Sequence, residues 1–266
     1  MIRQKLRTVL ALVAIMLSCL TFESAAWDWS RLAQAGMKGI QAMTLTDDDM
    51  IDYVRQSVTQ MDKKNKVAGP KSRYTIRLKK ITAGLTDVDG IPLNFKVYLT
   101  SQINAFACPD GSVRVFSGLM DVMNDDELLG VIGHEIGHVA KHHSKKALKA
   151  QLINDAARDV LGAKGGMVGA LSDSQLGAIG ATLLNTKYSR KQETEADDYG
   201  YYFLKSHGKN PLGMATAFQK LSSSGSEPSA LQKMFSDHPD TQARIKRVVD
   251  RARSDGYQIP AGLQSY

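Results

Sequence analysis

The chain has few cysteines and few aromatic residues. Cys19 and Cys108 are its only cysteines among 266 residues, which excludes the disulfide framework that holds many small secreted domains together. Cys108 is expected to be a small buried side chain, and a reactive thiol is the less favoured interpretation. Aromatic residues make up 7% of the sequence and do not interleave with a basic stripe, so the net charge of +7 does not indicate nucleic-acid binding.

The first 26 residues have the pattern of an export signal. Basic residues precede an apolar run at 9–17, which is too short to span a membrane comfortably, and small residues follow up to Ala26. We predict cleavage after Ala26, with lipidation of Cys19 as the less favoured alternative. A chain with 43% hydrophobic residues at this length supports one sizeable core, so residues 27–266 are expected to form a single domain.

The coarse pattern along the chain is helices, then strands, then helices. Apolar residues at helical spacing predict one helix from Thr46 onward and a second from Tyr74 to Leu85, ended by a turn at 87–90. Short strands are predicted at 94–99, 103–107 and 112–116. This order indicates an α+β fold that is mostly helical, with a small sheet of three to four strands.

A motif of the form H-E-x-x-H runs from His134 to His138 within a helical pattern that starts at the N-cap signal Asn124-x-x-Glu127. Two histidines four residues apart lie about 40° apart around a helix and roughly 6 Å apart along it. Both imidazoles can therefore reach one metal ion. Glu135 projects beside them and can take a proton from a metal-bound water.

A catalytic zinc needs a third protein ligand, and the nearest candidate is unsuitable. His142 lies eight residues after His134, about 12 Å along a helix, which is too far for both side chains to meet one ion. His142 and His143 are interpreted as a solvated helix end. The segment at 162–180, with six glycines, is expected to be a connector between helices, and a flap over the site is the less favoured interpretation.

An acidic segment offers better candidates for the third ligand. If residues 189–198 are helical, Glu193 and Asp197 share one face, so that Glu193 could complete the zinc shell while Asp197 accepts a hydrogen bond from a ligand imidazole. Glu195 points largely the other way. Spacing alone does not exclude a pairing of Glu195 with Asp198, or a solvated acidic helix start.

These motifs occur together with three further segments: residues 104–107 (Asn-Ala-Phe-Ala), residues 117–120 (Ser-Gly-Leu-Met), and His238-Pro239 followed by Arg244-Ile245. The combination resembles the HtpX-like and CAAX-prenyl-protease-like zinc metallopeptidases, a gluzincin family. Within it the chain is most similar to the LoiP type of bacterial envelope protease, over nearly all of its mature part. That type carries a lipid-attachment cysteine and a further cysteine pair, whereas this chain has only Cys108 beyond the leader.

The resemblance implies a zincin-like metallopeptidase domain at 27–266 with one Zn²⁺ ion per chain. It implies Glu193 as third metal ligand and Asp197 as the partner of a ligand imidazole. Glu135 is then the general base, and the zinc-bound water is the nucleophile.

The remaining candidate residues have open roles. His238 is expected to stabilise the oxyanion, although in some relatives this histidine ligates zinc and blocks the open position, and a surface or helix-capping histidine is the plain alternative. Arg244 either assists the substrate or forms a bracing ion pair. Asn104, Ala105 and Phe106 resemble an active-site edge strand that binds an extended substrate backbone, with an interior strand as the alternative.

The sequence therefore predicts a zinc endopeptidase that degrades unfolded or misassembled cell-envelope proteins. The expected location is the periplasm or the inner face of the outer membrane, where another envelope protease or chaperone is a candidate partner. The alternative is an envelope chaperone or assembly factor that cleaves rarely because His238 closes the metal site.

Overall fold

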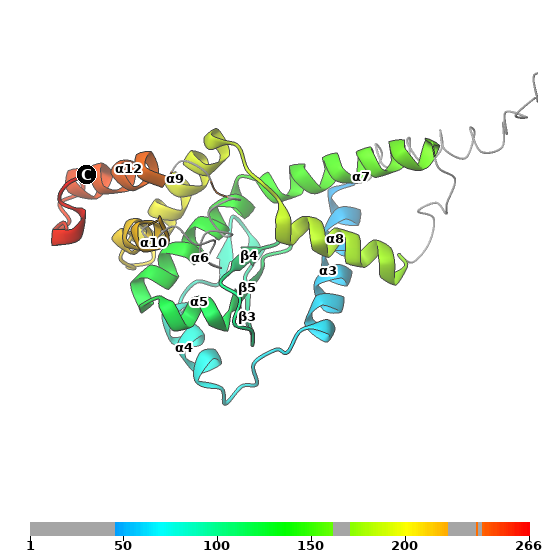
Figure 1. Cartoon of the computed structure of the whole chain (residues 1–266), viewed down its shortest axis with the longest axis horizontal. Helices are drawn as coiled ribbons and strands as arrows, with labels where there is room; N and C mark the ends of the chain where they lie inside the picture. Colours follow the sequence, from blue (N-terminus) through cyan, green and yellow to red (C-terminus); the bar gives the residue numbers. More distant parts are fainter. Residues whose placement is uncertain (1–45, 162–170, 223–237, 239–240) are drawn as a thin grey trace, which may run out of the picture.

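The computed structural model describes residues 46–161, 171–222, 238 and 241–266 (Figure 1). The helices are α3 (Asp47–Lys64), α4 (Arg73–Ile81), α5 (Ser117–Val122), α6 (Asp125–Ala140), α7 (His143–Leu161), α8 (Asp173–Asn185), α9 (Arg190–Ser206), α10 (Leu212–Ser222), α12 (Thr241–Ser254) and the 3₁₀ turn η1 (Ala261–Leu263). The strands are β1 (Asp87–Val88), β2 (Ile91–Pro92), β3 (Asn94–Tyr98), β4 (Ala105–Ala107) and β5 (Ser112–Phe116). The export signal predicted at 1–26 lies outside the described residues.

Side-chain caps fix the helix starts that the sequence predicts. Thr46 and Asn124 each form a capping box with the residue three positions later, and Ser189 does the same at the start of α9. At α6 the Asn124 side chain accepts a hydrogen bond from the amide of Glu127 at 2.9 Å, and the Glu127 carboxylate accepts one from the amide of Asn124 at 2.8 Å. These caps set the phase of the two helices that carry the site.

The predicted strands are confirmed, and they form a three-stranded sheet in the order β3-β5-β4. β3 runs parallel to β5, and β4 runs antiparallel to it. β4 is therefore an edge strand of this sheet. The predicted turn at 87–90 joins β1 to β2 through Asp89 and Gly90, whose positive φ angles of 50° and 81° suit a tight hairpin turn. The preceding helix ends at Ile81 rather than at Leu85, before a left-handed Gly84 with φ 88°.

Helix α6 lies at the centre of the molecule, between the sheet and helices α9 and α10 (Figure 1). It is buried on nearly all sides. Backbones of α6 and α9 touch at two glycines: a Cβ on Gly137 would lie 2.2 Å from the carbonyl oxygen of Ala196, and one on Gly200 would lie 2.5 Å from that of Gly133. This close approach places the acidic segment of α9 directly against the H-E-x-x-H turn.

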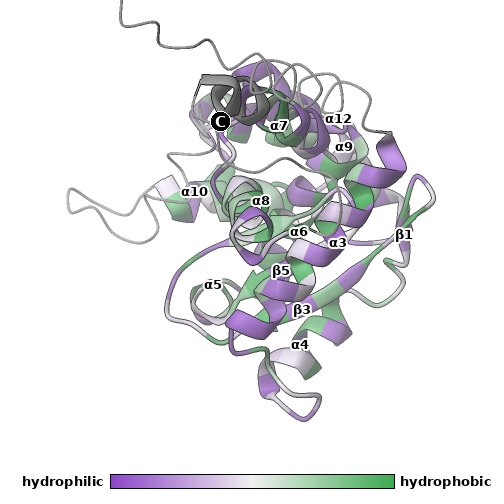
Figure 2. Cartoon of the chain, turned by 90° about the vertical axis from the view of Figure 1, so that its right-hand side faces the viewer, coloured by the Kyte–Doolittle hydropathy of each residue, from purple (hydrophilic) through white to green (hydrophobic). Residues whose placement is uncertain are grey.

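Helices α3, α7 and α8 bury apolar side chains in a second cluster, together with aromatic residues of the sheet (Figure 2). α3 packs on α8, where the Ser57 hydroxyl donates to the carbonyl of Leu176 at 2.8 Å. The second half of the glycine-rich segment is thus part of α8 rather than a connector, because the helix begins at Asp173; residues 162–170 lie outside the described part. Among the described residues, no helix combines the length and apolar character that a membrane span requires.

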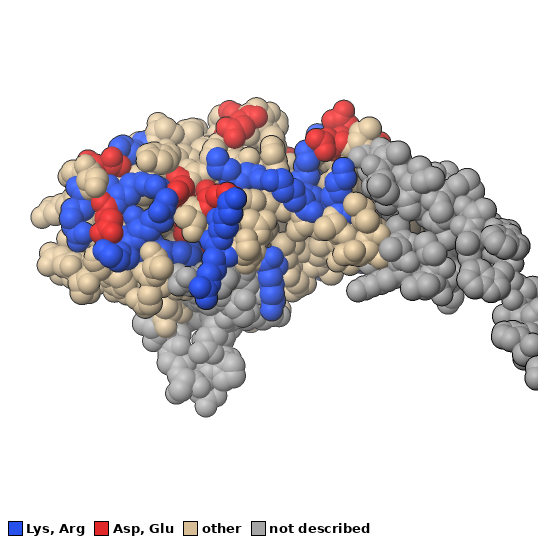
Figure 3. Space-filling view, turned by 90° about the horizontal axis from the view of Figure 1, so that it is seen from above, with Lys and Arg blue, Asp and Glu red and all other residues tan. Residues whose placement is uncertain are grey.

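On the face seen in Figure 3, Lys and Arg side chains gather with Asp and Glu side chains among them. Ion pairs join α12 to α9, because Arg247 and Arg251 both contact the Asp198 carboxylate, at 2.6 and 2.7 Å. Asp198 is thus engaged in surface ion pairs and does not belong to a metal-binding pair with Glu195.

Candidate active site

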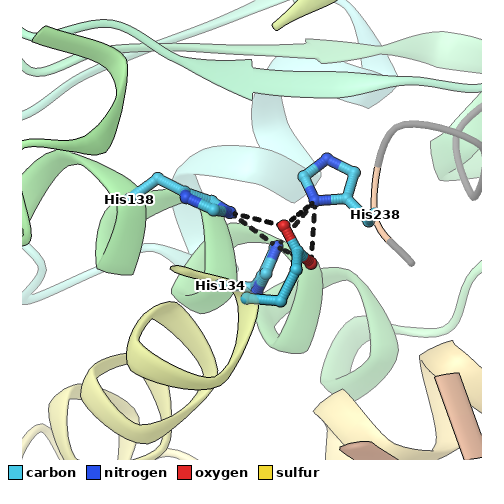
Figure 4. A group of neighbouring side chains, drawn as sticks. His134, His138 and His238 are labelled. Atoms are coloured by element: carbon cyan, nitrogen blue, oxygen red, sulfur yellow. Dashed lines mark hydrogen bonds and ion pairs between the residues drawn. The ribbon is translucent and has the colours of Figure 1, made fainter. Parts of the chain in front are cut away.

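Four side chains gather where α6 meets α9. His134, His138, Glu193 and His238 each offer one ligand atom, and these atoms all lie within 4.8 Å of one another. Figure 4 shows His134 and His138 projecting from one helix toward His238, which belongs to the segment between α10 and α12. Glu193 is 0% exposed and His134 is 2% exposed, so the group is shielded from solvent.

The spacing of these atoms fits a tetrahedral zinc ion. Ligand atoms about 2.0–2.2 Å from a tetrahedral ion lie roughly 3.3–3.6 Å from each other. The Nε2 atom of His134 lies 3.1 Å from that of His138 and 3.1 Å from Nδ1 of His238. Glu193 Oε1 lies 3.4 Å from His138 Nε2, and Oε2 lies 3.6 Å from His134 Nε2. Imidazole nitrogens with a carboxylate are a donor set that zinc prefers.

His134 is held from behind by a buried ion pair. Its Nδ1 lies 2.8 Å from Oδ1 of Asp197, and Arg244 donates to both oxygens of that carboxylate at 2.7 and 2.8 Å. Burial would raise the pKa of Asp197, but the charge and hydrogen bonds of Arg244 outweigh it and lower the pKa. A neighbouring Arg244 nitrogen lies 2.6 Å from Oε2 of Glu193, so one guanidinium braces both carboxylates.

His138 is held from behind by uncharged contacts. Its Nδ1 lies 3.0 Å from Nδ1 of His143, and its ring stacks on Tyr188 with 3.7 Å between ring centroids. His143 is 2% exposed, so the prediction of a solvated helix end is wrong for this residue. It is correct for His142, which is exposed. The reason is that the helix does not continue through this segment: α6 ends at Ala140, and His142 has a left-handed φ of 57°.

Glu135 lies beside the metal-ligand group with its carboxyl group directed toward β4. The residue is 4% exposed, and burial raises the pKa of its carboxyl group. Within the described part of the chain, its Oε1 has no hydrogen-bond partner. The Nε2 atom of His238 lies 3.8 Å from that oxygen. A carboxylate with one open acceptor atom beside a metal group is suited to take up a proton.

His238 and Glu193 influence each other's protonation. Burial alone would lower the pKa of His238, but the hydrogen bond and the charge of Glu193 outweigh it and raise the pKa. Burial likewise would raise the pKa of Glu193, whereas hydrogen bonds from His138 and His238 lower it well below the usual range for a glutamate. Glu193 is thus an ionised carboxylate, the form that binds a metal.

The comparisons with known proteins agree with this geometry. The model of Peptidase family M48 matches residues 73–252. The chain belongs to peptidase family M48. Metalloprotease LoiP of Escherichia coli (strain K12) is 40% identical over 92% of this chain and 97% of its own length. Metalloprotease YcaL of the same strain is 42% identical over 85% of this chain and 89% of its own length. The beta-barrel assembly-enhancing protease of that strain is 30% identical over 60% of this chain and 34% of its own length.

Membership in family M48 makes this protein a zinc metallopeptidase, as the sequence predicts. The residues that fit the zinc ion in this M48 peptidase are those of the group described above. His238 supplies a fourth donor atom in addition to the predicted three.

Most of the side chains expected to bind substrate in this M48 peptidase are buried or already paired. Phe106 is 4% exposed and packs edge-on against Phe116 in the core, so its side chain is closed to a substrate. Ala105 is also buried, and the Asn104 side chain accepts a hydrogen bond from the amide of Ala105. Arg244 is 4% exposed and held by carboxylates, which agrees with a brace rather than a substrate contact. The edge strand therefore offers backbone groups.

Three further side chains, those of Cys108, Tyr188 and His143, lie around the M48 site. Cys108, which follows β4, is fully buried, and burial raises the pKa of its thiol well above the ordinary value, as suits the predicted small apolar side chain. Tyr188 and the pairing of His143 with Glu195 were not predicted. Tyr188 lies in the connection between α8 and α9, where no periodic pattern marks it. The pairing of His143 depends on the bend between α6 and α7 at His142.

Proposed function

We propose that the protein is an endopeptidase that binds extended segments of unfolded or misassembled cell-envelope proteins and hydrolyses their peptide bonds. His134, His138 and Glu193 are the zinc ligands in this proposal, and Glu135 is the general base. The single observation that carries the assignment is the convergence of their ligand atoms at distances of 3.1 to 3.6 Å, next to a buried glutamate with an open oxygen.

Zinc, when bound by these residues, supplies Lewis acidity to the scissile carbonyl and to the attacking water. The chain supplies the proton transfers. Glu135 Oε1 accepts the proton of the attacking water, and burial, which raises the pKa of this carboxyl group, favours its protonated form. The same group then delivers the proton to the leaving amine. Asp197 fixes the orientation of His134 throughout.

Backbone groups of β4 are proposed to bind the substrate. The amides of Phe116 and Cys108 pair with the carbonyls of Asn104 and Ser112 across the β4–β5 ladder. Because backbone groups alternate in direction along a strand, those of Ala105 and Ala107 face away from β5. A substrate added as a further strand at this edge would be recognised through its backbone. It would pass close to Glu135, because the backbone of Ala107 in β4 contacts that carboxyl group and acts to lower its pKa. Such binding favours unfolded chains over a particular sequence.

A second function rests on the position of His238. Its Nδ1 lies 3.0 Å from Glu193 and 3.1 Å from His134, where a fourth zinc ligand would sit. In this arrangement His238 closes the position that water needs. A chaperone or assembly factor that cleaves rarely is the corresponding function. In the alternative, the imidazole of His238 leaves this position and stabilises the oxyanion.

The proposed location is the periplasm or the inner face of the outer membrane, supported by the export-signal pattern at 1–26. The beta-barrel assembly-enhancing protease among the relatives is consistent with a role in envelope protein assembly.

Digestion of casein by the zinc-loaded protein tests the proposal. We expect zinc-dependent cleavage that is lost in Glu135→Gln, which keeps the size of the side chain but cannot accept the proton. Equal activity of the two proteins would refute Glu135 as the base. His238→Ala separates the two functions: faster cleavage than wild type would indicate a histidine that closes the site, and slower cleavage would indicate one that assists catalysis.

A further inference from the structure

His138 is connected to the protein surface by two further side chains. Its Nδ1 lies 3.0 Å from Nδ1 of His143, and Nε2 of His143 lies 3.0 Å from Oε2 of Glu195. The side chains of His138 and His143 are 0% and 2% exposed, and that of Glu195 is 40% exposed. The three residues come from α6, α7 and α9, so this chain of contacts ties three helices together behind the metal group.

Proton positions in these contacts are determined by the metal. A neutral imidazole carries one proton, and a His138 that offers Nε2 to zinc must carry it on Nδ1. That N–H donates to Nδ1 of His143, which must then be the unprotonated acceptor. His143 consequently carries its own proton on Nε2 and donates it to the Glu195 carboxylate. Only this pair of tautomers satisfies both contacts while leaving Nε2 of His138 free for the metal.

The backbone is bent in a way that makes the contact with His143 feasible. Successive residues of an α-helix are turned by 100°, so in a continuous helix His143 would lie about 140° around the axis from His138 and would point away from it. The left-handed φ of 57° at His142 ends α6 and starts α7 in a new direction. Non-glycine residues adopt this conformation infrequently, and such strain persists where the surrounding structure enforces it. The bend brings His143 back against His138.

We propose that His143 and Glu195 are positioning residues of the zinc site, which hold His138 in the tautomer and orientation that direct its Nε2 to the metal. This inference rests on the proposed role of His138 as a ligand. We call the contacts from His138 through His143 to Glu195 the relay. The contact between Glu195 and Lys191, at 3.8 Å on the exposed face of α9, is not part of it.

Zinc release from the loaded full chain to a chromogenic chelator tests the role of His143. We expect His143→Ala to weaken zinc binding about 10- to 100-fold, the usual effect of losing such a partner of a ligand. His143→Asn should restore most of the affinity, because its Oδ1 takes the position of the imidazole Nδ1 and can accept the hydrogen bond from Nδ1–H of His138. His207→Ala removes an exposed histidine from the end of α9 and should leave zinc binding unchanged. Far-UV circular dichroism at saturating zinc verifies folding. A folded His143→Ala with wild-type zinc affinity would overturn the proposal.

Glu195 provides a test that a loss of packing cannot imitate. Because its side chain is partly exposed, we expect Glu195→Ala to fold and to weaken zinc binding by no more than about 10-fold, the lower end of the usual effect. Its effect should disappear in the His143→Ala background, since Glu195 acts only through His143. Lys191→Ala, which removes the other partner of Glu195, should have no effect. Additive effects of the two substitutions would contradict the relay.

Failure of the relay and failure of the proposed function give different results. If casein cleavage depends on Glu135 but His143→Ala keeps wild-type zinc affinity, only the relay is wrong. If zinc affinity depends on His143 but cleavage is indifferent to Glu135→Gln, the relay stands and the assigned base is wrong.

Discussion

The two histidines of the H-E-x-x-H motif are held in opposite ways. His134 rests on a charged group, the Asp197 carboxylate clamped by Arg244, and all three side chains are at most 4% exposed. His138 rests on neutral rings, His143 and Tyr188, and its chain of contacts ends at a partly exposed Glu195. The helix turn that carries both histidines is therefore supported in two ways. Asp197 and Arg244 form a charged support behind His134, which we call the deep support. His143, Tyr188 and Glu195 form the outer support behind His138, whose buried members are uncharged rings.

This difference has an energetic meaning. Charges removed from water are stable only while they remain paired, so the deep support can be broken only at high cost to the whole fold. The buried part of the outer support is neutral, and its one charge, on Glu195, is partly exposed. This support therefore costs less to bury and less to lose, and its effect should be confined to the metal. Substitutions on the deep side are therefore expected to destabilise the fold as well as the zinc site, and those on the outer side are expected to act mainly on zinc binding.

The largest effect should come from Arg244→Ala. It leaves the buried carboxylates of Glu193 and Asp197 without their common cation, and breaking such a pair costs about 3–5 kcal/mol. Urea denaturation of the metal-free protein measures the loss. Arg247→Ala, on the same helix but 47% exposed and paired with Asp198, is the matched control and should cost about 1 kcal/mol or less. Similar losses in both variants would remove the contrast between the two supports.

Gly137→Ala should damage both supports at once. The added Cβ would lie 2.2 Å from the carbonyl oxygen of Ala196, so α9 has to move, and with it Glu193 and Asp197. We expect a destabilisation of about 1–3 kcal/mol or more together with weaker zinc binding, seen in thermal unfolding with and without zinc. At Gly177 in α8 the nearest atom to a new Cβ is 3.9 Å away, so Gly177→Ala should be neutral or stabilising. A harmless Gly137→Ala would mean that α9 is free to shift.

The deep support follows from local sequence signals to a large extent. The N-caps Asn124 and Ser189 set the phase of α6 and α9, and a spacing of four residues puts Glu193 and Asp197 on one face. Which acidic pair faces the histidines needs either the structure or the family resemblance. The reason is that Gly137 allows the approach of α9, a contact between segments more than 50 residues apart.

The outer support could not be predicted from the sequence. A helical pattern continues past Ala140, and no glycine or proline marks the break, because the left-handed residue is His142. A histidine in that conformation is enforced by tertiary contacts rather than by local preference. Tyr188 is similar, since it lies in a loop and contacts His138 only after α8 and α9 are in place.

Asp197→Asn weakens the deep support without removing its shape. The amide can still accept a hydrogen bond from His134, but it lacks the charge that pairs with Arg244. Zinc affinity, measured by chelator competition, should fall about 10- to 100-fold. Asp198→Asn, at the neighbouring, partly exposed position, is the control and should retain zinc. If both variants bind zinc equally, Asp197 does not support the ligand.

The same variant gives a pH dependence in the metal-free protein. The pKa of Asp197 is lowered in the folded state, so its stabilisation is complete above the ordinary value of 3.8 and is lost as the pH falls below it. The difference in unfolding free energy between wild type and Asp197→Asn should therefore be constant at neutral pH and shrink below about pH 4. A difference that persists undiminished in acid would assign the effect to packing rather than to charge.

The smallest effect is expected at Tyr188, which supports His138 through its ring. Its ring stacks on His138, and its hydroxyl lies 3.0 Å from that of Ser144, so the two parts of the side chain can be tested separately. Tyr188→Leu loses a stacked contact, which is worth about 0.5–1.5 kcal/mol, and should weaken zinc binding by about two- to tenfold. Tyr188→Phe keeps the ring and should bind zinc like wild type. If Phe were as damaging as Leu, the bond to Ser144 would be the true support, and the outer side of the site would depend on a polar contact as the deep side does.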